Sequence, residues 1–295
     1  MTGAIIVDKP AGWTSHDVVG KLRRLTGIRR IGHLGTLDPP ATGVLPLLVG
    51  RATRLAQYFG RGSKRYEGTV RFGFTTDTWD AAGEPTSPET EVSLDCGALA
   101  QECRRFVGTI QQVPPPVSAK KVAGVPAYKL ARKNQAFDLP ACEVEIYSLQ
   151  VTRCEGREAD IDVRCSGGTY LRSIAHELGN GMSCGAHLKS LRRTESNGFT
   201  LAHARTIEQL ETWAAEDRMI EALIPARELL PDMPSELVDP STANFIRQGR
   251  SFRVSAFRPA TVSEAPLIKA VDASGDLIAI GEAKLPNLYQ PVLVL

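Results

Sequence analysis

Residues 32–46 read Gly32-His33-Leu34-Gly35-Thr36-Leu37-Asp38-Pro39-Pro40-Ala41-Thr42-Gly43-Val44-Leu45-Pro46, with three glycines, three prolines and one carboxylate. Each proline removes a backbone N–H and fixes φ, while each glycine permits φ values that are closed to other residues. This mixture is typical of a shaped loop rather than of a packed helix or strand. Pro39 favours an extended backbone at Asp38, the residue at the centre of the stretch. The sequence therefore predicts a loop that aims one carboxylate at a substrate.

Two other interpretations of this loop are open. An Asp-Pro pair often only begins a turn, and a glycine-rich loop can bind an anion through its backbone N–H groups. No Gly-Lys-Ser/Thr follows, which excludes a Walker A loop, and Gly32 and Gly35 lack the spacing of a dinucleotide fingerprint. A shaped loop of 15 residues in a compact domain is typically functional, which favours a carboxylate that faces a substrate.

The composition is that of a soluble globular protein, since 42% of the 295 residues are hydrophobic and 23% are charged. This length suits one large domain, or one large and one small domain. Residues 1–9 lack the charged and long apolar regions of a signal peptide, and no apolar run approaches the ~20 residues that span a bilayer. We therefore expect a cytoplasmic protein with no membrane partner.

The six cysteines form no Cys-x-x-Cys pair and are scattered singly along the chain, at Cys96, Cys103, Cys142, Cys154, Cys165 and Cys184. This spacing indicates single thiols rather than a disulfide framework. Cys184 and His187 offer two zinc ligands, whereas a zinc site needs three or four. We expect no metal.

Positive charge is concentrated near the N-terminus. Residues 1–75 contain 12 Lys and Arg against 4 Asp and Glu, a balance of +8, which leaves −6 for the rest of a chain whose net charge is +2. This asymmetry favours a polyanionic partner beside the Asp38 loop. The alternative is a solvated basic face.

Hydrophobic periodicity and breaker residues predict alternating helices and strands. We expect strands over residues 4–7, 64–74, 143–151, 159–165, 267–271, 277–281 and 291–295. We expect helices over residues 16–26, 53–58, 99–107, 128–132 and 170–178, the last ended by Gly179. Residues 80–95 read as a loop, residues 113–118 as an extended segment and residues 225–240 as a hinge.

Three further motifs contain residue types that a reactive carboxylate needs. Lys64-Arg65-Tyr66 places an aromatic ring between cations, an arrangement suited to stacking on a base with phosphates nearby. Gly168-Thr169-Tyr170-Leu171-Arg172-Ser173 places an arginine at the mouth of a helix, where it could pair with a carboxylate and keep it ionised. Leu191-Arg192-Arg193-Thr194 reads as a basic corner. Each motif taken alone is more often structural.

Taken together and in order, these motifs resemble those of the TruB family of pseudouridine synthases. The resemblance rests on residues 32–46 and also on Lys9-Pro10-x-Gly12-x-Thr14-Ser15, Lys64-Arg65-Tyr66, Thr76-Asp77-Thr78-x-Asp80-Ala81-x-Gly83, Val117-Ser118-Ala119-x-Lys121, Gly168-Thr169-Tyr170-x-Arg172 and Leu191-Arg192-Arg193-Thr194. It covers residues 4–200 and is looser beyond them. It implies an α+β fold, with a mixed, largely antiparallel sheet flanked by helices. It also implies a catalytic domain over residues 1–230 and a small β-rich, PUA-like RNA-binding domain over residues 235–295.

The resemblance further implies the reaction and its substrate, which is uridine 55 in the T-arm loop of tRNA. The enzyme would break the bond between ribose C1′ and N1, turn the uracil and join C1′ to C5, without metal, nucleotide or redox cofactor. Asp38 would be the nucleophile, attacking either C1′ or C6, and Arg172 would pair with it. Tyr66 would stack on the uracil, with removal of the C5 proton as a second possible role.

The substrate-binding residues follow from the same resemblance. His33 would fill the space that the flipped base leaves, and Tyr170 and Leu191 would line the pocket. Gly168 stands where many relatives have Lys, so one phosphate contact is missing there. We expect a monomer. The alternatives are a non-catalytic RNA-binding or chaperone protein and a synthase of the same fold that acts on another RNA site.

Overall fold

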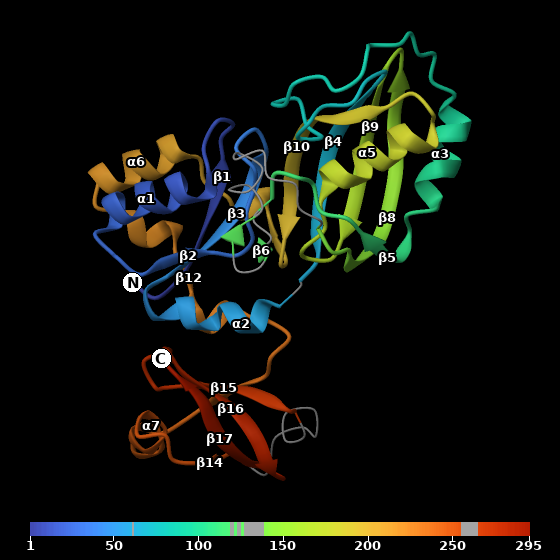
Figure 1. The fold of residues 1–295 in the computed structure, drawn as a ribbon. Helices are drawn as coiled ribbons and strands as arrows, with labels where there is room; N and C mark the ends of the chain where they lie inside the picture. Colours follow the sequence, from blue (N-terminus) through green and yellow to red (C-terminus); the bar gives the residue numbers. More distant parts are fainter. Residues whose placement is uncertain (61, 119–120, 123–124, 127–138, 255–264) are drawn as a thin grey trace.

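In the computed structural model of the protein, the described residues are 1–60, 62–118, 121–122, 125–126, 139–254 and 265–295. They form an α+β structure with a large sheet, flanking helices and a second, smaller sheet near the C-terminus (Figure 1). The helix expected over residues 128–132 lies outside the described residues. None of the helices in these ranges is both long and apolar enough to cross a membrane.

The large sheet has ten strands and is mixed but largely antiparallel, which confirms the predicted fold class. Only the pairing of β3 with β10 is parallel among the pairings described in this sheet. The main path runs in the order β12 (Ile224–Pro225), β1 (Gly3–Lys9), β3 (Thr42–Val49), β10 (Ala186–Ser196), β4 (Lys64–Phe72), β9 (Glu158–Cys165), β8 (Cys142–Glu155) and β5 (Gly108–Gln112). Beside this path, β2 (Ile31–His33) pairs with β3, and β11 (Phe199–Thr200) pairs with β10.

Helices cover one face of this sheet, with one pair at each end (Figure 1). Helices α1 (Ser15–Thr26) and α6 (Ile207–Ala215) lie beside β2 and β1, respectively, and α3 (Cys96–Arg104) and α5 (Leu171–Gly181) lie beside β8 and β10, respectively. Thr14 caps α1 in a capping box with Asp17. The smaller elements are α2 (Ala56–Phe59), the 3₁₀ turns Gly50–Leu55, Leu201–His203, Met219–Ala222 and Ala226–Glu228, and the paired strands β6 (Lys121–Val122) and β7 (Val125–Pro126).

Strand β1 is buried on both faces because it lies between two hydrophobic cores. Ile5 and Val7 point into the core beneath the helices, whereas Ala4 and Ile6 point into a second core shared with the C-terminal sheet. The C-terminal sheet contributes Ile280, among other side chains, to this second core. The large sheet and the C-terminal sheet are therefore packed together through apolar side chains.

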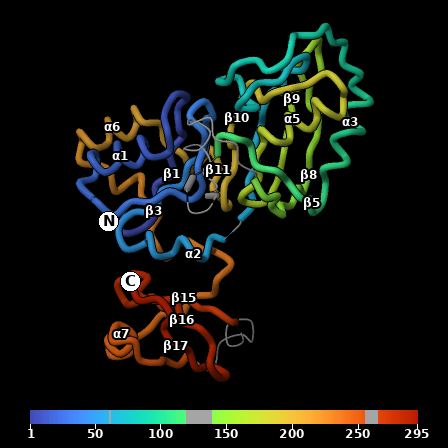
Figure 2. The backbone as a smooth tube through the Cα atoms, in the orientation of Figure 1, coloured from blue at the N-terminus to red at the C-terminus, as the bar shows by residue number. Residues whose placement is uncertain are grey.

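The C-terminal sheet runs in the order β13 (Ser235–Leu237), β15 (Leu267–Val271), β16 (Leu277–Leu285), β17 (Leu288–Val294) and β14 (Phe252–Arg253). Helix α7 (Pro240–Arg247) lies beside this sheet (Figure 2). Its residues Ala243 and Ile246 belong to a third hydrophobic core, which it shares with the sheet. The three strands expected beyond residue 260 are confirmed as β15, β16 and β17. The domain division at residues 230–235 stays a prediction.

The stretch 32–46 is not a single loop, and this prediction is wrong at both ends. Residues 31–33 form β2, and β3 begins at Thr42, so only residues 34–41 are outside strands. Burial of the apolar run 44–49 outweighs the breaker residues. Pro46 is accommodated in β3, opposite Ile6 in the register, and its carbonyl accepts a hydrogen bond from the Leu34 N–H at 2.9 Å.

Two other expectations are also corrected. Cys96, at the start of α3, and Cys154, near the end of β8, form a disulfide, although single thiols were expected. The packing of α3 on β8 brings together cysteines that are 58 residues apart, a juxtaposition that spacing alone does not show. Helix α5 continues past Gly179 and ends at Gly181. Gly179 does not end the helix: it lies within it, where the backbone of Ala186 leaves no room for a Cβ atom.

Candidate active site

Hydrogen bonds from the N-terminal part of the chain fix the segment that contains Asp38. The Ser15 hydroxyl and the Leu37 backbone exchange two hydrogen bonds, one from the Leu37 N–H to Oγ at 2.9 Å and one from Oγ to the Leu37 carbonyl at 3.2 Å. The Lys9 ammonium donates to the Pro39 carbonyl at 3.1 Å. The residues on both sides of Asp38 are therefore anchored to buried groups.

Lys9 is a buried lysine whose ammonium is satisfied by carbonyl oxygens. Besides Pro39, it donates to the carbonyls of Pro10 at 2.9 Å and Trp13 at 2.6 Å. Burial lowers the pKa of Lys9 to about 8, against an opposing contribution from the Asp38 carboxylate. Lys9 appeared in the sequence only as part of a motif, and its role in joining two segments was not predicted.

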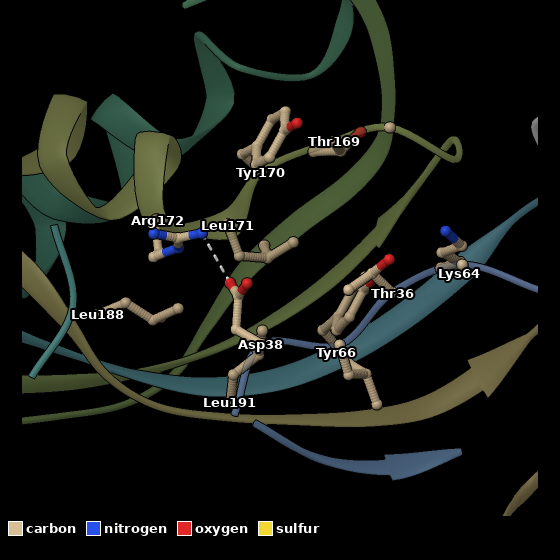
Figure 3. A pocket seen from close by; sticks show the side chains of 13 residues that line it. Thr36, Asp38, Lys64, Tyr66, Thr169, Tyr170, Leu171, Arg172, Leu188 and Leu191 are labelled. Carbon is tan, nitrogen blue, oxygen red and sulfur yellow. Dashed lines mark ion pairs between the residues drawn. The ribbon is translucent and has the colours of Figure 1, made fainter. Parts of the chain in front are cut away.

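Asp38 forms an ion pair with Arg172, which comes from the first turn of α5 (Figure 3). Arg172 Nη2 lies 2.9 Å from Asp38 Oδ2. The same guanidinium donates to the Thr78 carbonyl at 3.2 Å, and its Nε lies 3.7 Å from Asp80 Oδ2. Arg172 is thus held between two carboxylates, one of which, Asp80, was not among the predicted site residues.

Asp80 is fixed within its own turn. Its carboxylate accepts hydrogen bonds from the Thr78 hydroxyl at 2.6 Å and from the Ala82 N–H at 3.0 Å, and the residue is buried. The spacing Thr-x-Asp is a signal for such a turn. Its contact with Arg172, however, depends on the fold, since 92 residues separate the two positions in the sequence.

A cleft of about 260 Å³ opens beside this ion pair. It brings together five of the six predicted site residues, which are Asp38, Tyr66, Tyr170, Arg172 and Leu191 (Figure 3). The other lining residues are Gly35, Thr36, Leu37, Lys64, Gly168, Thr169, Leu171 and Leu188. The cleft therefore has an ion pair at one point and apolar or aromatic side chains around it, as a site for a planar ring requires.

Tyr66 lies on β4 and is buried, which raises the pKa of its hydroxyl above the ordinary value. The neighbouring Arg193 guanidinium opposes this shift, and burial outweighs it. The hydroxyl is therefore protonated near neutral pH. This favours ring packing over proton removal as the role of Tyr66 in the cleft.

Lys64 begins β4 and lines the same cleft. Burial, and secondly the Arg193 guanidinium, lower the pKa of Lys64 to about 8. No acidic side chain within the described residues forms an ion pair with its ammonium. A half-buried cation of this kind suits an anionic ligand.

Arg193 was expected in a basic corner at residues 191–194, and this prediction is wrong. The four residues lie within β10, and Arg193 is completely buried. Its Nε donates to the Val44 carbonyl at 2.7 Å, and its Nη atoms donate to the carbonyls of Gly35 at 3.2 Å and Thr36 at 3.4 Å. Arg193 is thus a support for the Asp38 segment rather than a surface cation.

His33 is the one predicted site residue that does not line the cleft. It ends β2, and its ring meets the His16 ring edge-on, with 5.6 Å between the centroids. Burial, followed by the neighbouring His16, lowers the pKa of His33. Its imidazole is therefore neutral at pH 7.

Cys184 and His187, the two candidate zinc ligands, belong to no cluster of metal-binding side chains in the part of the chain that is described. There, no three His, Cys, Asp or Glu side chains lie close enough to hold a metal ion. His187 packs on the Phe74 ring, with 4.6 Å between the centroids, and its Nδ1 lies 3.3 Å from the Phe74 carbonyl. Cys184 carries a free thiol.

Comparison with known proteins is consistent with this geometry. Residues 23–171 match the family model described as TruB family pseudouridylate synthase (N terminal domain), and residues 172–233 match that described as tRNA pseudouridylate synthase B C-terminal domain. The chain is 54% identical over 295 residues to a tRNA pseudouridine synthase B of Solibacter usitatus, with all of both chains covered. It is 41% identical to one of Paenarthrobacter aurescens, covering 100% of this chain and 95% of the relative.

Solved structures show the same fold. A chain from a Cbf5-Nop10-Gar1 complex superposes with a TM-score of 0.70 at 23% identity, covering 100% of this chain and 83% of that one. On the strength of the family models and of the relatives that match along its whole length, this chain belongs to the TruB family of pseudouridylate synthases.

Proposed function

We propose that this protein converts uridine 55 in the T-arm loop of tRNA into pseudouridine. The observation that carries the proposal is the ion pair between Asp38 and Arg172 at a cleft lined by Tyr66 and Leu191. A carboxylate that is paired with a guanidinium, half-exposed and beside a ring-sized apolar surface suits nucleophilic catalysis on a nucleoside. A protein that only binds RNA has no need of a carboxylate facing a polyanion.

The reaction rearranges one nucleoside and leaves its composition unchanged. The bond between C1′ and N1 breaks, the uracil turns, a bond between C1′ and C5 forms, and the proton on C5 leaves while N1 gains one. Asp38 acts as the nucleophile, and attack at ribose C1′ or at C6 of the base would both start from its carboxylate. No electron is gained or lost, so the balance needs no redox cofactor.

The surrounding side chains bind and orient the nucleotide. Tyr66 packs on the uracil with its hydroxyl protonated, and Tyr170 and Leu191 close the cleft around the ring. Arg172 pairs with the Asp38 carboxylate and fixes its direction. Lys64 faces a phosphate of the bound strand. This cation partly replaces the phosphate contact that is missing because position 168 is a glycine.

Uridine 55 must leave its stack to reach this cleft, at a cost of a few kcal/mol. We assign to His33 the space that the base vacates. Its position outside the cleft and its neutral, partly buried ring suit stacking in place of a base. The catalytic domain over residues 1–230 would bind the T arm, and the PUA-like domain over residues 235–295 would add a second contact with the RNA.

We further propose that the protein acts on tRNA as a monomer in the cytoplasm. The basic N-terminal quarter supplies the electrostatic attraction for the RNA. The affinity for tRNA should therefore fall linearly on a log–log plot against salt concentration.

The decisive experiment is incubation with an unmodified tRNA transcript, followed by position-resolved mapping of pseudouridine. We expect a single new pseudouridine at position 55. Modification at another position would assign a different RNA site to the same fold. Tight tRNA binding without any pseudouridine would favour the chaperone alternative.

A further inference from the structure

Gln112, the last residue of β5, clamps the backbone of Tyr170 with both ends of its side-chain amide. The Tyr170 N–H donates to Gln112 Oε1 at 2.8 Å, and Gln112 Nε2 donates to the Tyr170 carbonyl at 3.1 Å. Gln112 is buried, with only 6% of the residue exposed to solvent. Both polar groups of a buried amide are thus used on one residue that lies 58 positions away in the sequence.

This clamp takes the place of a helix cap. Tyr170 is the N-cap residue of α5, and its side chain makes no capping hydrogen bond. The next residue after Gln112 adds a third contact, because the Ser173 hydroxyl donates to the Val113 carbonyl at 2.7 Å. The first turn of α5 is therefore fixed by hydrogen bonds to the end of β5 and to the residue that follows it.

The first turn of α5 is also the part of the helix that faces the cleft. Tyr170 and Arg172 both line it, and Arg172 reaches Asp38 from there (Figure 3). A shift in the backbone of Tyr170 would move its ring and the guanidinium together. Gln112 itself is not among the residues that line the cleft, and both hydrogen bonds given for its side chain in the described structure go to Tyr170.

We infer that Gln112 is a positioning residue, which sets the first turn of α5 and so aligns Arg172 and Tyr170 with Asp38. The inference rests on the proposed function, since it assigns to Gln112 an effect on the rate of uridine isomerisation. The glutamine amide offers one donor and one acceptor to the backbone of a single residue at any pH near neutrality. Methionine offers neither, and an ionised glutamate offers no donor.

The test compares Gln112→Met with Gln111→Met, which changes the same residue type at the exposed neighbouring position of β5. We expect Gln112→Met to lower kcat on tRNA by about tenfold to a hundredfold, because small misplacements of catalytic groups have effects of that size. The KM and the Kd for tRNA should change less than about threefold, since phosphate contacts dominate affinity. Gln111→Met should match the wild type in all three.

Gln112→Glu provides a second variant with its own signature. A buried carboxyl has a raised pKa, and its protonated form again has one donor and one acceptor. The kcat of Gln112→Glu, divided by that of the wild type at the same pH, should therefore rise as the pH falls from about 8 to about 6. A purely structural role would lower the melting temperature without producing this pH-dependent ratio in kcat.

The outcomes separate the two proposals. If the wild type forms no pseudouridine, the proposed function fails. If the wild type is active and both Gln112 variants keep its kcat at every pH, the inference about Gln112 fails alone. Should Gln112→Met not fold, the pH dependence of Gln112→Glu decides: a flat ratio overturns the inference, and a ratio that rises towards low pH supports it.

Discussion

The ion pair between Asp38 and Arg172 joins an exposed carboxylate to a buried guanidinium. The Asp38 side chain is 42% exposed, the Arg172 side chain 6%, and 2.9 Å separate Oδ2 from Nη2. Arg172 is fixed from behind by Asp80 and the Thr78 carbonyl, so its direction does not depend on Asp38. The cation is therefore preorganised, while the carboxylate remains open to a substrate.

Asp38→Asn should abolish pseudouridine formation and leave tRNA binding largely unchanged. An amide keeps the size of the side chain but is not a nucleophile, so the first covalent step is lost. Pseudouridine mapping and a tRNA-binding assay, both run at the same salt concentration, test this. Turnover at the wild-type rate by the variant would show that the nucleophile lies elsewhere.

Arg172→Met should lower both activity and stability. Asp80 is buried, and loss of its cationic neighbour leaves a charge uncompensated, which costs about 3–5 kcal/mol when a buried pair is broken. We expect this loss in urea unfolding, together with loss of pseudouridine formation.

Arg105→Met is the matched control for this prediction. It removes a guanidinium whose side chain is 72% exposed, against 6% for Arg172, and which pairs with Glu102, so a loss of only about 0–1 kcal/mol is expected. Equal stability of the two variants would show that the burial of Arg172 and Asp80 has no energetic weight.

The reactive residues could be predicted from the sequence more reliably than their supports. Asp38, Tyr66 and Arg172 lie in short motifs with distinctive residue types, and the structure places all three at one cleft. Their roles remain predictions. The prediction for Arg193 is wrong because two adjacent arginines are typical of an exposed surface. Its burial in β10 depends on pairing with strands that are distant in the sequence, such as β4.

The same limit explains the error at residues 42–46. Glycine and proline content predicts a loop from local preferences, but β3 is stabilised by burial of its apolar run on both faces. The clamp formed by Gln112 left no local signal either, because an amide at the end of a strand is ordinary until its partner is known. Long-range contacts, rather than local propensities, decide these features.

Gly43→Ala should destabilise the protein strongly. Gly43 has φ = +101°, and a Cβ atom there would lie 2.2 Å from the Arg193 carbonyl oxygen, within the parallel pairing of β3 with β10. Backbone atoms of a central strand cannot move aside cheaply, so we expect a loss of about 3 kcal/mol or more from overpacking and strain together.

Gly12→Ala separates strain from steric overlap. Gly12 also has a positive φ, +81°, but no atom lies within 4 Å of the place that a Cβ atom would take, so only the strain of about 1 kcal/mol is expected. The free energies of unfolding in urea, measured for both variants, test the comparison. A Gly43→Ala variant no less stable than Gly12→Ala would contradict the close approach of β3 to β10.

Lys64→Met should make the protein more stable and weaken its binding to tRNA. The pKa of Lys64 is about 8 in the folded protein, against an ordinary value of 10.5. Between these two pH values the unfolded chain binds more protons than the folded one, so the contribution of Lys64 to stability rises with pH across this window. Below pH 8 the ammonium is charged in the folded protein, and its burial lowers the free energy of unfolding by the full amount. Lys64→Met removes this charge and should therefore raise the melting temperature at pH 7 by about 2–4 °C.

The same substitution should weaken binding to tRNA. Loss of one phosphate contact lowers the log–log salt slope by about 1. In the wild type the affinity should also fall as the pH rises through about 8, and this step should vanish in Lys64→Met. Lys189→Met, which removes an exposed lysine paired with Glu158, should keep the step. Persistence of the step in Lys64→Met would assign it to another group and remove Lys64 from the RNA-binding surface.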